Sequence, residues 1–409
     1  MRKNQLVLAL AALGFAGSAM ATNGYFAHGY GMAAKGMGGA GIAYPQDALA
    51  AATNPAGMVH VGSRMDIGLD IFAPDRGFTF AGGSPDGNGS GAMESWFPIP
   101  EFGYNRMINK DMSVGVSVFG NGGMNTTYGD GNHPFTVFPG GPGAGATVGI
   151  DLMQLFIAPT VAYKVNPQFS VGASLNLIAQ SFESKGLGGF GQADAGKDYS
   201  TGVSLRLGGM YQVSDRVTVG ATYQTKSNMS KFDDYAVMFP NAGEFDIPAT
   251  YGVGIALKAN DKVDVAFDVM RIDYNGVAVT GNKATFPLFG ANQHGFGWDD
   301  QTVFKLGVSY KHRNDLTLRA GLNYGKQPID VATVAVPGDI TSDLNTLAPG
   351  VVETHLTLGF TKDLSADSSI TGAYMHAFKK EVSGVGAFLG ASTLEMSQNS
   401  FGLSYNKKF

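Results

Sequence analysis

Three basic side chains in this sequence stand where they could hold an anionic group. Arg206, Lys305 and Arg319 each interrupt a run in which polar and apolar residues alternate, and each shares the parity of the polar side. Guanidinium and ammonium groups on one polar surface could pair with the carboxylate of a ligand. Acidic residues have the same parity, so the cations could instead pair within the protein: Asp264, Asp268 and Glu353.

Other residue types that bind metals or cofactors show no supporting pattern. The chain has seven His and no Cys, and the histidines lack the spacing of metal ligands. Gly36-x-Gly38-x-x-Gly41 matches a dinucleotide fingerprint, but that fingerprint needs a strand before it and a helix after it in a βαβ unit. No such unit surrounds it, so we expect no metal and no cofactor. A net charge of −5 gives no reason to expect a nucleic-acid partner.

The elements that carry these residues are predicted to be strands with one apolar face. Residues 399–409 alternate strictly and end on an aromatic, with these residues on one side: Phe401, Leu403, Tyr405 and Phe409. Alternation with period two is typical of a strand with opposite faces of different polarity. Tight-turn signals between such runs predict six hairpins, at 98–120, 152–182, 200–226, 246–274, 298–325 and 351–379, and two single strands, at 63–72 and 399–409. The prediction is therefore fourteen strands.

Seven longer connections, rich in Gly, Pro, Asn and Asp, are predicted between these elements: 73–97, 121–151, 183–199, 227–245, 275–297, 326–350 and 380–398. Tight turns that alternate with long loops are typical of bacterial outer-membrane barrels, with the turns in the periplasm. Parity assigns one face of each strand to lipid. On the strand near 304, for example, Phe304, Leu306 and Val308 face outward and Lys305 inward.

The chain opens with the pattern of an export signal. Arg2 and Lys3 precede an apolar stretch over 6–15, and Ala19-Met20-Ala21 supplies the small residues of a cleavage site. We therefore expect a signal peptide at residues 1–21. The apolar stretch is too short for a membrane anchor, and no run reaches the roughly 18 apolar residues of a helical span.

Composition agrees with a chain that meets lipid. Charged residues make up 15%, against about 25% in ordinary soluble proteins, and 59 of 409 residues are Gly. The fold class predicted is all-β: a 14-stranded antiparallel transmembrane β-barrel, multi-pass, in a bacterial outer membrane. Its partners would include outer-membrane lipid and lipopolysaccharide. Residues 62–409 would form the barrel, and the glycine-rich residues 22–61 would fold into the lumen as a plug, because fourteen strands enclose a wide lumen. A plugged barrel can act alone, so we expect a monomer.

Several stretches resemble the FadL/TodX family of outer-membrane proteins. Residues 36–57 look like the N-terminal hatch of that family, and Asn54-Pro55-Ala56 is the most recognisable piece. Residues 119–128 look like the end of the family's third strand, and residues 297–310 resemble another shared segment. The terminal Phe409 resembles the assembly signal of outer-membrane barrels.

The resemblance implies a barrel closed by its hatch, with Gly36, Gly38, Gly41, Asn54, Pro55 and Ala56 in the hatch. It implies passive uptake of hydrophobic small molecules, which are long-chain fatty acids in some members and aromatic hydrocarbons in others. Ligand would leave sideways where the third strand kinks, at Gly120, Asn121, Gly122 and Gly123, although a loop that begins at Gly120 would explain the same residues. Candidate capture residues, which could instead pack the loops into a cap, are Phe135, Phe138, Leu152, Leu155 and Phe156.

Fatty acids are slightly favoured as ligands, with neutral aromatic hydrocarbons as the alternative. Where some relatives carry a lysine, this chain has Trp298-Asp299-Asp300, which counts against an anionic ligand. An open porin is a further possibility. An enzyme is not expected, and a lipolytic outer-membrane enzyme is the alternative from that class. His376 shares the parity of the lipid-facing side, but no neighbouring motif supports a catalytic role.

Overall fold

A computed structural model describes residues 22–89, 95–129, 133–137, 141, 143, 146–285, 294–334 and 336–409. The predicted signal peptide at 1–21 lies outside these residues. Within them, no helix is long and apolar enough to cross a membrane.

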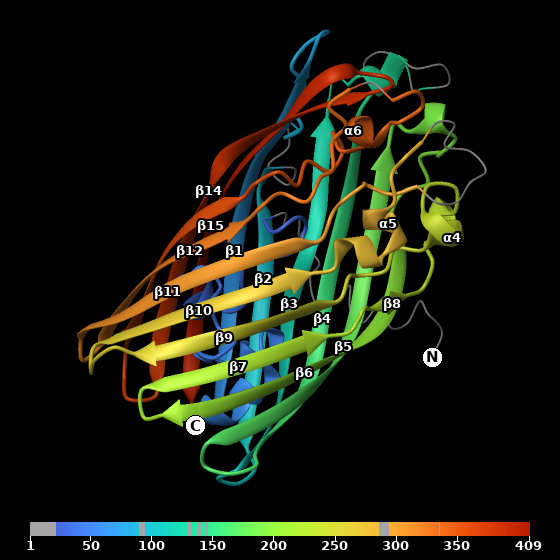
Figure 1. Cartoon of the computed structure of the whole chain (residues 1–409). Coiled ribbons are helices and arrows are strands. Elements are labelled where there is room, and N and C mark those ends of the chain that lie inside the picture. Colours follow the sequence, from blue (N-terminus) through green and yellow to red (C-terminus); the bar gives the residue numbers. More distant parts are fainter. Residues whose placement is uncertain are drawn as a thin grey trace.

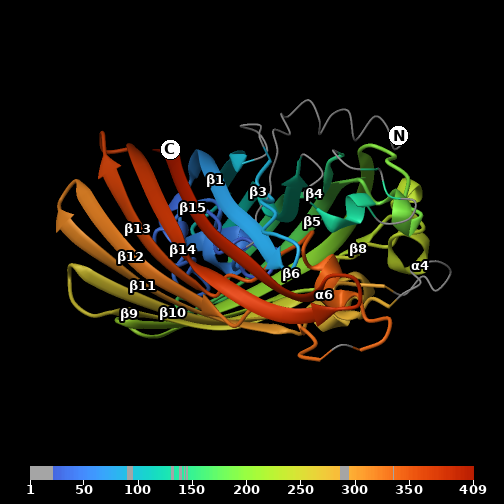
Figure 2. The ribbon, with the colours of Figure 1, turned by 90° about the horizontal axis from the view of Figure 1, so that it is seen from above.

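Fourteen antiparallel strands close into a barrel, as the sequence predicts (Figures 1 and 2). They are β1 (Arg64–Phe80), β2 (Phe97–Met107), β3 (Met112–Tyr128), β4 (Val148–Lys164), β5 (Phe169–Lys185), β6 (Asp198–Ser214), β7 (Val217–Gln224), β9 (Thr250–Lys258), β10 (Val263–Ile272), β11 (Gln301–Arg313), β12 (Leu316–Gly325), β13 (Thr354–Asp363), β14 (Ser368–Gly386) and β15 (Gly390–Lys408). The two-residue strand β8 (Asn228–Met229) only extends the pairing of β6. The barrel closes between β1 and β15, which pair from Arg64 opposite Lys408 to Phe80 opposite Ser392.

The tight turns at one end of the barrel repeat one local structure. The side-chain oxygen of Asn109 accepts hydrogen bonds from the backbone N–H groups two and three residues later, at 2.9 Å each. Asn166 and Asn260 make the same pair of bonds in their turns. Asparagine suits this position because its short side chain replaces a backbone acceptor. The predicted turns at these three positions are therefore confirmed.

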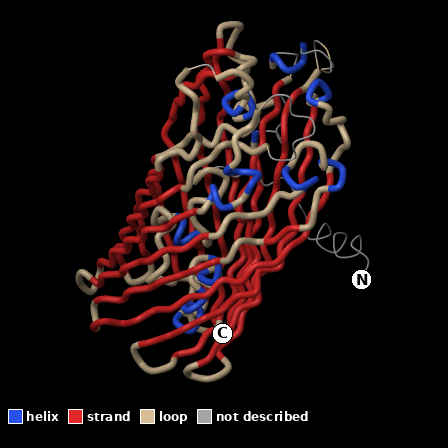
Figure 3. The backbone as a smooth tube through the Cα atoms, turned by 45° about the vertical axis from the view of Figure 1, so that its right-hand side comes forward, coloured by secondary structure: helices blue, strands red, loops and turns tan. Residues whose placement is uncertain are grey.

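The longer connections gather at the opposite, loop end of the barrel and carry short helices (Figures 1 and 3). These are η3 (Pro134–Val137), η4 (Gly188–Phe190), η5 (Asp233–Tyr235), α4 (Pro240–Gly243), η6 (Tyr274–Gly276), α5 (Ala278–Gly281) and α6 (Thr341–Leu344). Three predicted connections were wrong in part. β1 and β3 run on to Phe80 and Tyr128, and 380–398 is almost entirely strand. In β14 the register shifts between Ala377 and Lys380, which breaks the parity that the prediction relied on.

The faces of the strands follow the predicted parity. Phe304, Leu306 and Val308 are exposed on the outside of the barrel, whereas Lys305 is only 5% exposed and points inward. Outward apolar side chains form a surface that suits a bilayer. Arg271, which shares the outward parity, pairs with Asp300 at 3.0 Å instead of standing alone.

Residues 22–61, called the N-terminal segment below, lie inside the barrel (Figure 2). The segment contains α2 (Met32–Lys35), η1 (Ala50–Ala52) and η2 (Pro55–His60). Nearly all of its side chains are buried, although the segment has little regular structure of its own. Its burial therefore comes from contact with the inner wall.

Candidate functional site

Glycines of the wall let the N-terminal segment lie directly against the strands. A Cβ atom added to Gly307 would stand 2.6 Å from Met37, and one added to Gly220 would stand 2.6 Å from the carbonyl oxygen of Ile42. Such distances leave no room for a side chain. Further inward glycines that meet the segment in this way are Gly103, Gly172, Gly208, Gly254, Gly321, Gly359 and Gly402. The contact is therefore backbone against backbone over much of the wall.

The glycines predicted in the segment occupy matching positions. Gly36 packs on Gly359. A Cβ atom added to either glycine would lie 2.9 Å from the Cα atom of the other glycine. Gly38 has a φ of +68°, which glycine adopts without strain, and its N–H donates to the Thr357 hydroxyl at 2.8 Å. The N–H of Gly41 donates to the Asp268 carboxylate of β10 at 2.7 Å. The motif that resembled a nucleotide fingerprint thus contacts the wall.

Asn54 begins η2 and joins it to the barrel. Its side-chain oxygen accepts the N–H of Ala56 at 3.1 Å, and Pro55 occupies the first helical position, where no N–H is required. Its amide nitrogen donates to the carbonyl oxygens of Ile42 at 2.7 Å and of Gly209 at 3.2 Å. One side chain therefore caps the helix and links it to β6.

Buried charges add a second set of contacts. Lys35 of α2 pairs with Asp70 of β1 at 2.8 Å and with Glu101 of β2 at 3.4 Å, and all three side chains are at most 4% exposed. Burial alone would lower the pKa of Lys35, but the two carboxylates raise it above its ordinary value. In the same region, burial and then the neighbouring Asp66 carboxylate raise the pKa of Asp47 to about 7.

The three predicted lumen cations point inward, but they contact the N-terminal segment and the wall. Lys305 donates to the carbonyl oxygen of His28 at 2.9 Å, and Arg206 donates to the carbonyl oxygen of Thr53 at 3.3 Å. Arg319 donates to the amide oxygen of Gln46 at 2.8 Å. All three of these acceptors are neutral. The hydrogen bonds therefore do not support the alternative in which the cations only form ion pairs within the wall.

The pairing of β3 changes at the predicted kink. The register between β3 and β4 shifts between Gly120 and Gly122, which leaves Asn121 as an extra residue. The kink is not the start of a loop, since β3 continues to Tyr128. Pairing between β2 and β3 ends at Phe102 opposite Val118, so that within the described residues the stretch 97–101 pairs with β1 alone.

The N-terminal segment takes the place of β2 beside the kink. Phe26 forms an isolated bridge with Gly122. The N–H of Ala27 donates to the carbonyl oxygen of Asn121 at 3.0 Å, and the N–H of Gly123 donates to that of Tyr25 at 3.1 Å. The edge of β3 is thereby covered from inside the barrel instead of by its neighbouring strand.

Two prolines explain why β2 does not pair at this level. Pro98 and Pro100 lack an N–H group and lie two residues apart, so that both missing donors fall on the same edge of β2. The ladder between this stretch and β1 is continuous, with Pro98 opposite Ile71 and Pro100 opposite Leu69. The edge without donors is therefore the one that faces β3.

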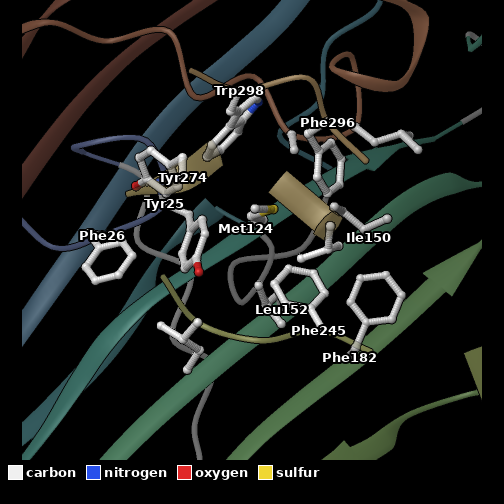
Figure 4. Packing of buried hydrophobic residues seen from close by; sticks show 14 of the residues in the cluster. Tyr25, Phe26, Met124, Ile150, Leu152, Phe182, Phe245, Tyr274, Phe296 and Trp298 are labelled. Atoms are coloured by element: carbon white, nitrogen blue, oxygen red, sulfur yellow. The ribbon is translucent and has the colours of Figure 1, made fainter. Parts of the chain in front are cut away.

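Above the segment, aromatic side chains fill the lumen (Figure 4). The ring of Tyr25 lies 5.6 Å from that of Tyr274 and 6.0 Å from Trp298, and Phe245 approaches it from the other side at 6.4 Å. These residues belong to one buried cluster that also contains Met124, Ile150, Leu152 and Phe182 (Figure 4). The middle of the barrel is thus apolar, and Tyr25 and Phe26 of the N-terminal segment are part of this cluster.

Two apolar cavities border this cluster. The outer cavity, among the connections at the loop end, has an enclosed volume of about 40 Å³, or about 580 Å³ when space open to solvent is included, and is lined by Leu187, Gln192, Val237, Met238, Phe239, Val279, His294, Gly295, Phe296, Leu344 and Leu347. The inner cavity is narrower, with an enclosed volume of about 10 Å³, or about 310 Å³ when open space is included, and is lined by Phe72, Pro74, Gly123, Met124, Asn125, Trp298, Ala348, Pro349, Gly350 and Met396. Gly123 of the kink therefore borders the inner cavity. No Lys or Arg is among the described residues that line either one.

The predicted capture residues that the structure describes are not among the described lining residues of either cavity. Phe135 packs on His133 with ring centroids 4.4 Å apart, and Phe156 stacks on Phe119 at 5.4 Å. Leu152 is fully buried in the aromatic cluster, Leu155 is half-buried, and Phe138 lies outside the described residues. The sequence did not predict the lining residues because a few residues from each of four separate connections build the outer cavity.

A closed barrel with exposed apolar strands, a buried N-terminal segment and apolar cavities defines a class of outer-membrane transport proteins. The profile of the family described as outer membrane protein transport protein (OMPP1/FadL/TodX) matches residues 7–409. The chain therefore belongs to this family of outer-membrane transporters of hydrophobic compounds. A comparison with curated protein sequences found no significant match.

Solved structures share the fold at low sequence identity. The toluene transporter TodX of P. putida has a TM-score of 0.71 and 22% identity, over 93% of this chain and 99% of that one. The toluene transporter TbuX of Ralstonia pickettii has a TM-score of 0.68 and 21% identity, over 93% and 99%. A FadL homologue of Pseudomonas aeruginosa has a TM-score of 0.68 and 18% identity, over 94% and 100%.

Proposed function

We propose that this protein carries neutral hydrophobic small molecules, such as monoaromatic hydrocarbons, passively across the outer membrane. The ligand is captured in the outer cavity, moves to the inner cavity and leaves sideways into the bilayer beside β3. Removing apolar surface from water favours binding by about 0.8 kcal/mol per methylene, so that apolar walls alone retain such a ligand. No energy source is needed when a later step consumes the ligand.

The observation that supports a neutral ligand is the lining of the two cavities. Their described lining residues include no Lys or Arg that could neutralise a carboxylate. An unpaired carboxylate in such surroundings would lose its hydration without compensation. The structurally similar proteins TodX and TbuX are toluene transporters, which agrees with this choice of ligand class.

Long-chain fatty acids are the second candidate. Arg206 is only 4% exposed inside the barrel, and its hydrogen bonds go to the neutral oxygens of Thr53 and Gln224. A buried guanidinium with neutral acceptors could pair with a carboxylate if the N-terminal segment moved away.

The unpaired stretch of β2 supports a sideways exit. Residues 97–101 have no partner on β3, and the inner cavity reaches Gly123 on the facing part of β3. An apolar ligand that leaves between two strands enters lipid without crossing water. In this proposal the N-terminal segment acts as a plug, because its contacts with the wall hold it across the lumen.

Uptake into proteoliposomes tests the proposed ligand class. In liposomes with lipopolysaccharide in the outer leaflet, which slows direct entry of apolar solutes, we expect labelled toluene to enter faster with the protein than without it, and the entry of labelled oleate to increase much less. An equal or greater increase in the entry rate of oleate would favour long-chain fatty acids, the second candidate. No gain with either compound would reject the proposed function.

A further inference from the structure

One short segment contributes residues to the walls of both the outer cavity and the inner cavity. Residues 341–350, called the partition segment, comprise α6 and the six residues that follow it. Leu344 and Leu347 line the outer cavity. Ala348, Pro349 and Gly350 line the inner cavity. The segment therefore forms part of the wall of each cavity.

Asn345 ties the partition segment to both cavities. Its side-chain oxygen accepts a hydrogen bond from the indole N–H of Trp298 at 2.7 Å, and Trp298 lines the inner cavity. Its amide nitrogen donates to the carbonyl oxygen of Phe296 at 2.7 Å, and Phe296 lines the outer cavity. Asn345 is fully buried, so these bonds have no competition from water.

The segment is also attached to the upper part of β3, beyond the kink. The hydroxyl of Thr126 donates to the carbonyl oxygen of Leu347 at 2.8 Å, and the hydroxyl of Tyr128 donates to that of Thr346 at 2.6 Å. The hydroxyl of Thr346 lies 3.0 Å from Nε2 of His133. These hydrogen bonds attach the segment to β3, while Leu347 and Ala348 pack in the buried apolar cluster and the Asp343 carboxylate accepts the N–H groups of Phe388 and Leu389.

We propose that the partition segment is an internal gate between ligand capture and the inner cavity, held closed by Asn345 and by the hydrogen bonds to β3. The gate regulates the transport route of the proposed function and rests on it. Opening requires the segment to leave β3 while the barrel stays closed. An aromatic ligand in the outer cavity contacts Leu344 and Leu347 first, so that it reaches the gate before it reaches Trp298.

The chain offers a clean way to lock the gate. It has no cysteine, and a Cβ atom at Gly384 of β14 would lie 2.7 Å from the hydroxyl of Ser342 in α6. The double variant Ser342→Cys, Gly384→Cys can therefore form a disulfide that fixes the partition segment to the wall. A matched control uses the same β14 position. The single variant Gly384→Cys adds the same side chain to the wall and has no second cysteine in the chain with which to form a disulfide.

Tryptophan fluorescence reports arrival in the inner cavity. The chain has two tryptophans, and Trp96 is exposed whereas Trp298 lines the inner cavity. In a Trp96→Phe background, quenching by bromobenzene followed by stopped flow measures how fast a heavy-atom aromatic reaches Trp298. We expect the oxidised Ser342–Gly384 pair to slow quenching by about tenfold and a reductant to restore it. The single variant Gly384→Cys should quench at the parental rate with and without reductant.

Each result decides one claim. Parental quenching in the oxidised Ser342–Gly384 variant would overturn the gate and leave the proposed function intact. Absence of quenching in the Trp96→Phe parent protein would overturn the proposed function itself. If the disulfide variant does not fold, Asn345→Ala gives a second test, since loss of its hydrogen bonds should quicken quenching about threefold. An unchanged or slower rate in that variant would also reject the gate.

Discussion

Single glycines decide how closely the N-terminal segment approaches the wall. Gly208 and Gly209 are neighbours on β6 and face opposite sides of the barrel. A Cβ on Gly208 would lie 2.9 Å from Pro55 and closer still to Asn54, whereas a Cβ on Gly209 would meet nothing nearer than 3.7 Å. Adjacent positions of the same residue type thus have different tolerance for a side chain.

We expect Gly208→Val to displace the Asn54-Pro55-Ala56 turn, because the added methyl groups overlap it. Overpacking of this kind costs about 1–3 kcal/mol. Ion conductance in planar bilayers should show frequent openings in this variant and few in the parent. Gly209→Val is the matched control and should behave as the parent does. Equal conductance of the two variants would contradict the role given to Gly208.

Sequence parity located the inward residues but not their partners. Arg206, Lys305 and Arg319 are inside the barrel as predicted, because alternation fixes the face of each strand. Their contacts with Thr53, His28 and Gln46 could not be foreseen. Those partners lie far away in sequence within a segment that has no periodicity of its own.

The kink in β3 is the element-scale feature on which the sideways exit depends. Asn121 is the extra residue, and its side chain donates to Gln154 at 3.0 Å and accepts from the Tyr30 hydroxyl at 3.0 Å. Its fully buried side chain therefore supports the irregular pairing from inside. The glycines around Asn121 predict the position of the kink. The loss of pairing between β2 and β3 follows from Pro98 and Pro100, which the prediction did not take into account.

Deletion of Asn121 should remove the extra residue and let β3 run in register past Gly120. Without the extra residue β3 would no longer bend away from the proline-bearing stretch of β2, and toluene entry into proteoliposomes should fall to the protein-free rate. Asn121→Ala keeps the number of residues and should retain most transport. A gel shift on boiling checks that both variants form the barrel. Unchanged transport in the deletion variant would rule out exit at this place.

At the scale of the whole molecule, the barrel and the N-terminal segment differ in how far the sequence predicts them. The strand count came from alternation and tight turns, which are local signals. The path of the segment depends on contacts with strands from β1 to β15, which are not local. The strand ends at 380–398 were missed for a related reason, since the register shift near Ala377 interrupts the alternation.

Removal of residues 22–61 tests the plug directly. We expect the remaining fourteen strands to form a barrel with a wide aqueous pore, so that single-channel conductance rises sharply. The parent protein, measured in the same bilayers, provides the comparison. Little change in conductance would mean that the loop end, rather than the N-terminal segment, seals the pore.

The seam between β1 and β15 has a consequence for biogenesis. β1 is synthesised near the start of the chain and β15 at its end, and the two pair over the whole length from Arg64 to Phe80. The N-terminal segment touches glycines on strands all around the wall, including Gly402 on β15 itself. Its docking surface is therefore incomplete until the final strand arrives. The machinery that inserts the barrel must keep residues 22–61 inside the open sheet until β15 pairs with β1.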